Sequence, residues 1–249
     1  MARRVVAVFG LLGLPLGPCC QASAQDIVRA VAPMAVPRVH IEPSPLSRTW
    51  EFASATREKT GTGFFVDDSG HMLTARHAAD DCTGLVVAKE GRAVAARVVA
   101  LSAANDLALI KVPRTLGLAA VFPRRSVASS NDMVFASGYD RLQANRGMLA
   151  NATVAASPAS GADALVIDSD VTFGASGAPV LDGRGLVQGI VSRRIATGRV
   201  VAVAAGDAKT FLAANGVQFE QDDRSQISGA GSRADRAASI SARVICLQN

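Results

Sequence analysis

The 249-residue sequence has few residues of the types that build metal sites and nucleic-acid-binding surfaces. It contains only three histidines and four cysteines, and beyond residue 24 these form no compact cluster, so no metal site is expected. Lysine is also scarce, because 22 of the 26 basic residues are arginine. The arginines occur singly or in pairs along the chain, a distribution that disfavours a nucleic-acid-binding surface.

Long apolar runs are missing as well, apart from one at the N-terminus, so no stable membrane insertion is expected. That run, residues 5–16, follows the basic pair Arg3 and Arg4 and precedes the small residues Ala-Ser-Ala at 22–24. A basic start, an apolar middle and a small-residue end are the features of a secretory signal peptide. We therefore expect residues 1–24 to be a cleaved leader and the mature protein to be exported, either periplasmic or secreted.

Two other interpretations of the N-terminus are less consistent with its sequence. A membrane anchor would need a longer apolar run, and this run is broken by Gly10, Gly13 and Pro15. A lipoprotein leader ending at Cys19 would place Pro18 in front of the lipidated cysteine, where proline is a poor residue.

Only two cysteines, Cys82 and Cys246, remain after the leader is removed. In an oxidising compartment such a pair tends to form a disulfide. The bridge would enclose 163 residues and tie the segment after His77 to the C-terminus. Free or intermolecular thiols are the alternative.

Short segments rich in Val, Ala and Leu, separated by turn signals, follow one another through most of the chain. Many short strands of this kind are typical of an all-β barrel or sandwich. The clearest predicted hairpin joins residues 62–66 to 71–75 through an Asp-Asp-Ser-Gly turn. A crossover at 113–118 divides the predicted strands into a first group, about 36–112, and a second group, about 118–205.

The C-terminal part departs from this strand pattern. Residues 207–215 have the pattern of a helix, with Asp207 as the N-cap and Gly216 just beyond the end. Residues 221–249 are expected to form a polar linker followed by one last strand.

Residues 168–180 form the most unusual segment, in which Ser176 lies between Gly174 and Gly177. Glycine adopts backbone conformations that other residues reach only at a cost, so this sequence suits a tight loop that exposes the serine. Such a loop can direct backbone N–H groups at one point, as a tetrahedral oxyanion requires. Taken alone, a plain Gly-Ser turn between strands explains the segment equally well.

Two further segments accompany this loop, Thr-Ala-Arg-His77 and Asn-Asp106-Leu-Ala-Leu-Ile-Lys-Val. The order of His77, Asp106 and Ser176, which are 29 and 70 residues apart, resembles that of the trypsin/chymotrypsin-like serine proteases. The motifs are similar to those of the bacterial branch that includes the high-temperature-requirement periplasmic proteases. The resemblance covers about residues 61–216.

This resemblance implies an all-β fold of two six-stranded antiparallel β-barrels with a C-terminal helix, and an active site in the cleft between the barrels. The protease domain would occupy residues 25–220, without the appended peptide-binding (PDZ) module that many relatives carry. The implied partners are polypeptide substrates, and the oligomeric state is left open.

A Ser-His-Asp triad would supply the chemistry without a cofactor. A serine hydroxyl needs a base to remove its proton as it attacks, and histidine suits that task near neutral pH. We therefore expect Ser176 to be the nucleophile, His77 the general base and then acid, and Asp106 the carboxylate that orients the imidazole. The family uses the N–H groups at the positions of Gly174 and Ser176 as its oxyanion hole.

Other residues and another fold fit less well. His40 and His71 are expected to have surface or packing roles, and Asp168 a structural one. An α/β-hydrolase would need a Gly-x-Ser-x-Gly elbow, whereas the second residue after Ser176 is Ala178. Its catalytic residues would also follow the order Ser, acid, His rather than His, Asp, Ser.

Two positions beside the nucleophile depart from the family pattern. The family's Asn or Asp is Ala175 here, which removes side-chain contacts that usually brace the loop, and its second glycine is Ala178. These changes leave open an inactive or weakly active relative that binds polypeptides. A serine esterase that uses the same triad is a further alternative.

Four residues are expected to bind substrate. Val191, Ser192 and Arg193 belong to a segment that resembles the strand lining the family's primary specificity pocket. Asp170 lies six residues before the nucleophile, where trypsin-like enzymes place the acid that selects Lys or Arg. We expect a modest preference for cleavage after basic residues, unless Arg193 or Arg194 neutralises Asp170.

Overall fold

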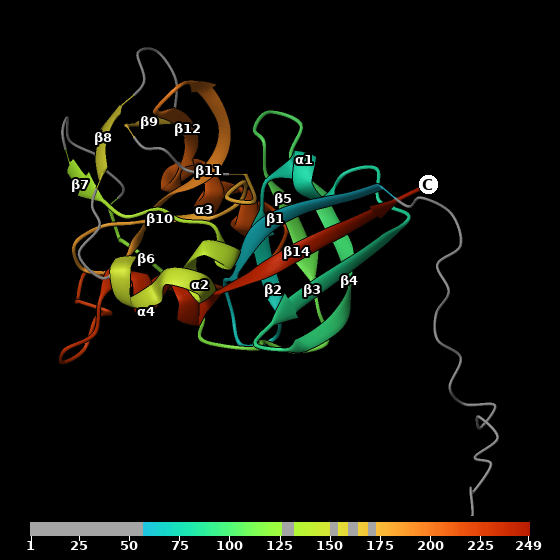
Figure 1. The fold of residues 1–249 in the computed structure, drawn as a ribbon, viewed down its shortest axis with the longest axis horizontal. Helices are drawn as coiled ribbons and strands as arrows, with labels where there is room; N and C mark the ends of the chain where they lie inside the picture. Colours follow the sequence, from blue (N-terminus) through green and yellow to red (C-terminus); the bar gives the residue numbers. More distant parts are fainter. Residues whose placement is uncertain (1–56, 126–131, 150–153, 159–163, 169–172) are drawn as a thin grey trace, which may run out of the picture. The chain divides into compact units, whose positions relative to one another are not determined.

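The computed structural model describes residues 57–125, 132–149, 154–158, 164–168 and 173–249 (Figure 1). These residues belong to one of the two compact units into which the chain divides, Phe52–Asn249. The expected leader, and the part of the first barrel expected before residue 57, lie outside the described residues.

The first barrel is closed and consists of six antiparallel strands. In barrel order they are β1 (Arg57–Phe65), β14 (Ser241–Gln248), β3 (Gly84–Lys89), β4 (Arg92–Leu101), β5 (Ala108–Lys111) and β2 (His71–Thr74). Figure 1 shows β14, in red, beside β1, in blue-green, although they come from opposite ends of the described chain. The first barrel thus extends beyond the expected range 36–112, because β14 completes it.

Consecutive apolar residues in the first barrel face two different cores. Phe65 and Met72 are paired across β1 and β2 and belong to the barrel interior. The adjacent pair, Phe64 and Leu73, belongs to a cluster that continues into the second barrel. Because side chains alternate along a strand, a sheet buried on both faces needs nearly continuous apolar sequence. This requirement accounts for runs such as Leu-Ala-Leu-Ile at β5.

The second barrel is a six-stranded sheet that is nearly closed, since Phe135 forms a β-bridge to Leu181 in the opposite edge strand. In sheet order its strands are β10 (Pro179–Leu181), β11 (Val187–Ala196), β12 (Arg199–Ala204), β9 (Ala164–Asp168), β8 (Val154–Pro158) and β7 (Asp132–Val134). A short parallel pair, β6 (Val121–Phe122) and β13 (Glu220–Gln221), accompanies the barrels. The expected fold of two six-stranded antiparallel barrels is confirmed.

Helices occur at four places in the described residues, as α1 (Arg76–Ala79), α2 (Tyr139–Leu149), α3 (Ala205–Ala214) and α4 (Arg233–Ile240). The expected C-terminal helix corresponds to α3, but it begins earlier, directly after β12. Its N-cap is Ala204, so the prediction of Asp207 as the N-cap was wrong. Asp207 lies in the first turn and accepts a hydrogen bond from the Asn105 side chain at 3.2 Å.

Part of the segment expected to be a polar linker forms α4, which begins with a capping box. The Ser232 hydroxyl accepts a hydrogen bond from the Asp235 N–H, and the Asp235 carboxylate accepts one from the Ser232 N–H. Such a box satisfies two N–H groups that the start of a helix otherwise leaves unpaired. The polar residues that favoured a linker therefore serve the helix cap, while most of the helix's apolar residues are buried.

Candidate active site

The loop that contains Ser176 precedes β10, and its geometry depends on two glycines. Gly174 and Gly177 both have a φ of +86°, in the left-handed region that other residues rarely adopt. A Cβ on Gly177 would lie 2.1 Å from the carbonyl oxygen of Thr62, so no larger residue fits there without a shift. The expectation of a tight, glycine-dependent loop around Ser176 agrees with this geometry.

Backbone hydrogen bonds and apolar packing hold this loop against the second barrel. The Gly177 N–H donates to the Val191 carbonyl at 2.7 Å, and the Val191 N–H donates to the Ala178 carbonyl at 2.9 Å. Ala175 and Ala178 are almost completely buried in the apolar cluster of that barrel. The two residues that depart from the family pattern thus give the loop apolar support in place of polar contacts.

His77 lies on α1, directly after β2, and Asp106 lies just before β5. Because β2 and β5 pair with Thr74 opposite Ala108, the end of one strand and the start of the other meet at the same edge of the barrel. His77 Nδ1 lies 2.8 Å from Asp106 Oδ2, and the His77 backbone N–H donates to Asp106 Oδ1 at 3.1 Å. The carboxylate therefore holds both the ring and the backbone of His77.

Asp106 has a second partner residue, which the sequence analysis assigned only to substrate binding. Ser192, on β11 of the second barrel, is buried and donates its hydroxyl to Asp106 Oδ2 at 2.6 Å. Burial of Asp106 acts to raise its pKa, but hydrogen bonds from His77 and Ser192 outweigh burial and hold the pKa below its ordinary value. Asp106 is therefore ionised at neutral pH and can stabilise a positively charged imidazole.

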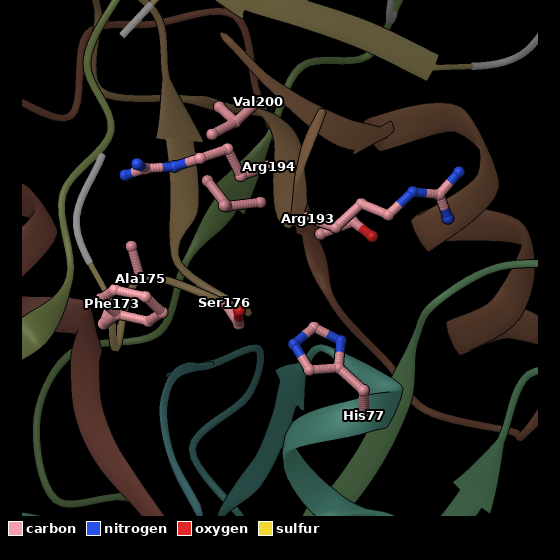
Figure 2. Close-up of a pocket in the computed structure, with 9 residues that line it drawn as sticks. His77, Phe173, Ala175, Ser176, Arg193, Arg194 and Val200 are labelled. Carbon is pink, nitrogen blue, oxygen red and sulfur yellow. The ribbon is translucent and has the colours of Figure 1, made fainter. Parts of the chain in front are cut away.

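His77 and Ser176 line the same pocket, which has a volume of about 300 Å³. In Figure 2 the edge of the imidazole turns toward the Ser176 side chain. A proton on Nδ1 can be donated to Asp106, which leaves the Nε2 lone pair to accept a proton from a hydroxyl. The other residues that line the pocket are Phe173, Ala175, Val191, Ser192, Arg193, Arg194 and Val200.

The first barrel contacts the Ser176 loop through β1, a contact that the sequence analysis missed. A Cβ on Gly61 would lie 3.0 Å from the Ser176 carbonyl oxygen and 2.9 Å from the Cβ of Ala78, the neighbour of His77 in α1. The next residue, Thr62, donates its N–H to the Ser176 carbonyl at 2.8 Å. The signal in the sequence is a threonine between two glycines, Gly61 and Gly63, within β1.

The N–H groups expected to form the oxyanion hole, those of Gly174 and Ser176, donate no hydrogen bond to any of the described residues. The carbonyl groups of the same two residues are both hydrogen-bonded to Thr62. The loop therefore has satisfied acceptors and two backbone donors available to a ligand. Donors fixed in this way suit the stabilisation of a developing negative charge.

The remaining residues singled out from the sequence lie elsewhere. His71 pairs with Asp67 across the turn between β1 and β2, and Asp168 pairs with an arginine of β12. Neither His71 nor Asp168 lines the pocket. His40 and Asp170 lie outside the described residues.

Cys82 and Cys246 are joined by a disulfide, with their Cα atoms 5.3 Å apart. Cys82 follows α1, and Cys246 is fully buried in β14. The bridge therefore connects the segment after the helix that carries His77 to the C-terminal strand of the first barrel.

The part of the chain that the structure describes lacks two kinds of feature. Its side chains contain no group of three or more His, Cys, Asp or Glu residues arranged to hold a metal ion. Its helices include none with the length and apolar composition needed to cross a membrane.

The arrangement of His77, Asp106 and Ser176 agrees with a match to a known protein family. The family described as the trypsin-like peptidase domain matches residues 61–190, which is more than half of the chain. The protein belongs to the trypsin-like peptidase family. The matched range includes His77, Asp106 and Ser176 and begins beside Thr62.

The curated relatives of this trypsin-like peptidase are longer proteins. Serine endoprotease DegS of Escherichia coli is 29% identical over 136 residues, which cover 52% of this chain and 38% of DegS. The uncharacterized protein y4bJ of Sinorhizobium fredii is 28% identical over 223 residues, which cover 82% of this chain and 35% of y4bJ. The chain thus spans little more than a third of the length of these relatives.

Solved structures share the fold of this trypsin-like peptidase. The serine endoprotease from Yersinia pestis has a TM-score of 0.54 and 23% identity, covering 62% of this chain and 57% of that chain. The Rv3671c protease, in its inactive form, has a TM-score of 0.51 and 22% identity, covering 64% of this chain and 88% of that chain. Together with the family match and the DegS similarity, they confirm the expected trypsin-like fold and its high-temperature-requirement-like branch.

Proposed function

We propose that this trypsin-like peptidase is an active serine endopeptidase with Ser176, His77 and Asp106 as its catalytic triad. The main support is the hydrogen-bonded set of His77, Asp106 and Ser192, whose imidazole turns toward Ser176 in one pocket. A nucleophile, a base and a group that orients the base are the parts that covalent catalysis by serine requires.

The proposed reaction has two halves. Ser176 Oγ attacks the carbonyl carbon of the scissile peptide while His77 Nε2 takes the hydroxyl proton. The C–N bond then breaks, His77 gives the proton to the leaving amine, and Ser176 remains acylated. Water attacks the acyl-enzyme with His77 again as the base, which releases the acid product and restores the serine. Asp106 stays ionised and stabilises the imidazolium in both halves.

The N–H groups of Gly174 and Ser176 are proposed to bind the oxyanion that forms in each half. This proposal is supported by two observations. Neither N–H group donates a hydrogen bond to a described residue, and the carbonyl groups of the same two residues accept hydrogen bonds from Thr62 of β1. Removal of one such donor typically lowers kcat about 10²- to 10³-fold. The oxyanion hole is thus expected to supply a large share of the rate enhancement.

Polypeptide substrates are proposed to lie along β11, in contact with Val191, Ser192 and Arg193. Asp170 is proposed to favour Lys or Arg before the cut. Arg193 and Arg194 line the pocket and oppose that preference, so it is expected to be modest. Peptides that differ only in the residue before the cut test this proposal, and equal cleavage after Leu and Arg would refute it.

Export of the protein is proposed from its N-terminal sequence and its disulfide. Residues 1–24 have the composition of a leader, and disulfides persist mainly in oxidising compartments. Protein recovered from the periplasm or the medium is expected to begin at Gln25. Recovery of the uncleaved chain from the cytoplasm alone would contradict export.

Casein hydrolysis and fluorophosphonate labelling of the purified mature protein test the proposed activity. A serine endopeptidase is expected to be labelled and to degrade casein. Labelling without casein hydrolysis would indicate an esterase, and neither would indicate a relative that only binds polypeptides.

Ser176→Ala is expected to lower casein turnover at least about 10⁴-fold without unfolding the protein. Ser225→Ala is the matched control, because Ser225 is an exposed serine outside the pocket. It is expected to retain labelling and turnover. Equal activity of the Ser176→Ala variant and the wild type would overturn the assignment of the nucleophile.

A further inference from the structure

Thr62, in the middle of β1, is completely buried and makes two hydrogen bonds to the Ser176 loop. Its N–H donates to the Ser176 carbonyl at 2.8 Å, and its hydroxyl donates to the Gly174 carbonyl at 2.7 Å. One residue of the first barrel thus holds both carbonyls of the residues whose N–H groups are the proposed oxyanion donors.

The remaining polar groups of Thr62 are also paired, which fixes its orientation. The Tyr139 N–H, at the start of α2, donates to the Thr62 hydroxyl oxygen at 2.9 Å. The Thr74 hydroxyl donates to the Thr62 carbonyl at 2.7 Å. Because the Tyr139 N–H approaches the hydroxyl oxygen as a donor, the hydroxyl proton is directed to the Gly174 carbonyl.

The loop itself lacks a polar side chain that could provide this support. Ala175, between Gly174 and Ser176, is buried and has no hydrogen-bonding side chain. Gly174 has a positive φ, and no atom lies close to the position where a Cβ would be. Neither a side chain nor close neighbours therefore restrain its backbone. A support from outside the loop is therefore needed to hold the backbone at Gly174 in one conformation, and with it the two peptides that meet there.

We propose that Thr62 is a positioning residue whose hydroxyl holds the oxyanion loop in its catalytic conformation. This inference rests on the proposed endopeptidase function. Loss of the hydroxyl leaves the Gly174 carbonyl without this partner and loosens the backbone at Gly174. The Gly174 N–H, which belongs to the adjoining peptide on its N-terminal side, is then no longer held in place. A misplaced donor then weakens binding of the tetrahedral intermediate more than binding of the substrate.

Thr62→Val and Thr62→Ser separate the hydroxyl from the shape of the side chain. Thr62→Val keeps the volume and removes the hydroxyl, and it is expected to lower kcat about tenfold to a hundredfold with little change in KM. Thr62→Ser restores the donor and is expected to remain within about threefold of the wild type. If serine fails to rescue what valine loses, the hydroxyl is not the active feature and the proposal is wrong.

A peptide boronic acid provides a readout that loss of stability alone would not change. Its adduct with serine is tetrahedral and places an oxygen in the oxyanion hole, whereas a peptide bound to a Ser176→Ala background tests ground-state binding. Thr62→Val is expected to weaken boronate binding about tenfold or more and to leave peptide binding unchanged. Equal weakening of both would indicate a general structural role and overturn the proposal.

Thr115→Val is the matched control. The Thr115 hydroxyl also donates to a backbone carbonyl, that of Asp67, and neither residue lines the pocket. It is expected to cost some stability and to leave kcat and boronate binding unchanged. A loss of kcat as large as that of Thr62→Val would contradict a specific role for Thr62.

Fluorophosphonate labelling of Thr62→Cys and of the wild type covers two remaining outcomes. If Thr62→Val does not fold, Thr62→Cys replaces it, and labelling slower than that of Thr62→Ser is expected because a thiol is a weaker donor. Labelling of Thr62→Cys as fast as that of Thr62→Ser would overturn the proposal. If the wild type itself resists labelling, the proposed endopeptidase function fails. If the wild type is labelled and Thr62→Val is labelled equally fast, only the proposal for Thr62 fails.

Discussion

Asp106 links both barrels through its side chain, because it accepts hydrogen bonds from His77 of the first barrel and Ser192 of the second. The sequence predicted the His77 contact from the order of the motifs. It did not predict the Ser192 contact, because a hydrogen bond between two barrels leaves no spacing pattern in the chain. The same limit applies to Thr62, whose hydroxyl has partners 77 and 112 residues away.

Ionisation of Asp106 is predicted to make stability depend on pH in the acid range. Its pKa is lower in the folded state than the ordinary value of about 3.9. The stabilisation is therefore complete above that value and is lost as the pH falls through the lower, folded-state pKa. Asp106→Asn cannot titrate, so it is expected to be less stable than the wild type at pH 6, with a difference that shrinks below about pH 4.

Thermal unfolding of both proteins between pH 2 and pH 6 measures this difference. Asp68→Asn is the control, because Asp68 is exposed in the turn between β1 and β2. It is expected to follow the wild type throughout. A difference between the wild type and Asp106→Asn that stays constant with pH would contradict the prediction.

At the scale of the loop, three glycine variants are predicted to form a graded series. Gly183 is exposed with open space at its Cβ position, so Gly183→Ala is expected to change stability by less than about 0.5 kcal/mol. Gly174 has a positive φ without crowding, and Gly174→Ala is expected to cost about 1 kcal/mol. Gly177 has a positive φ and is also crowded at its Cβ position, so Gly177→Ala is expected to cost about 3 kcal/mol or more.

Urea unfolding of the three variants measures the series. The same order is expected for their unfolding midpoints, with Gly177→Ala the lowest. A Gly177→Ala protein as stable as Gly183→Ala would show that the loop does not adopt the described conformation against Thr62.

Elements with strong local signals were predictable and those stabilised by distant contacts were not. The hairpin of β1 and β2 follows from two short apolar segments and the Asp-Asp-Ser-Gly turn between them, whose Asp67 accepts hydrogen bonds from the Ser69 and His71 N–H groups. By contrast, α2 has almost no apolar periodicity, and the sequence analysis predicted no helix there. Its first N–H is satisfied by Thr62, a tertiary contact that the local sequence does not show.

On the scale of the whole molecule, the first barrel depends on a strand from the far end of the chain. β14 pairs with both β1 and β3, so residues 241–248 complete the barrel whose strand β2 leads into the helix that carries His77. Pairing between distant segments carries a large entropy cost before it is stabilised. The sequence predicted a last strand here but not the barrel to which it belongs.

The disulfide is predicted to stabilise this distant pairing. A bridge that closes a long loop typically contributes about 2 to 5 kcal/mol, and Cys82 and Cys246 are 164 residues apart. The Cys82→Ala, Cys246→Ala double variant is expected to unfold at a lower temperature than the wild type. Full reduction is expected to lower the unfolding temperature of the wild type and to leave that of the double variant unchanged. An unchanged wild type after full reduction would contradict the prediction.

In the proposed mechanism His77, from the first barrel, activates Ser176, from the second. The most direct test is the second-order rate of fluorophosphonate labelling, with the labelled peptide identified by mass spectrometry, in the wild type and in His77→Ala. We predict labelling of Ser176 in the wild type and a rate at least about 10³-fold lower in His77→Ala, because the hydroxyl then lacks its base. Equal rates in the two proteins, or a label on another residue, would contradict the account.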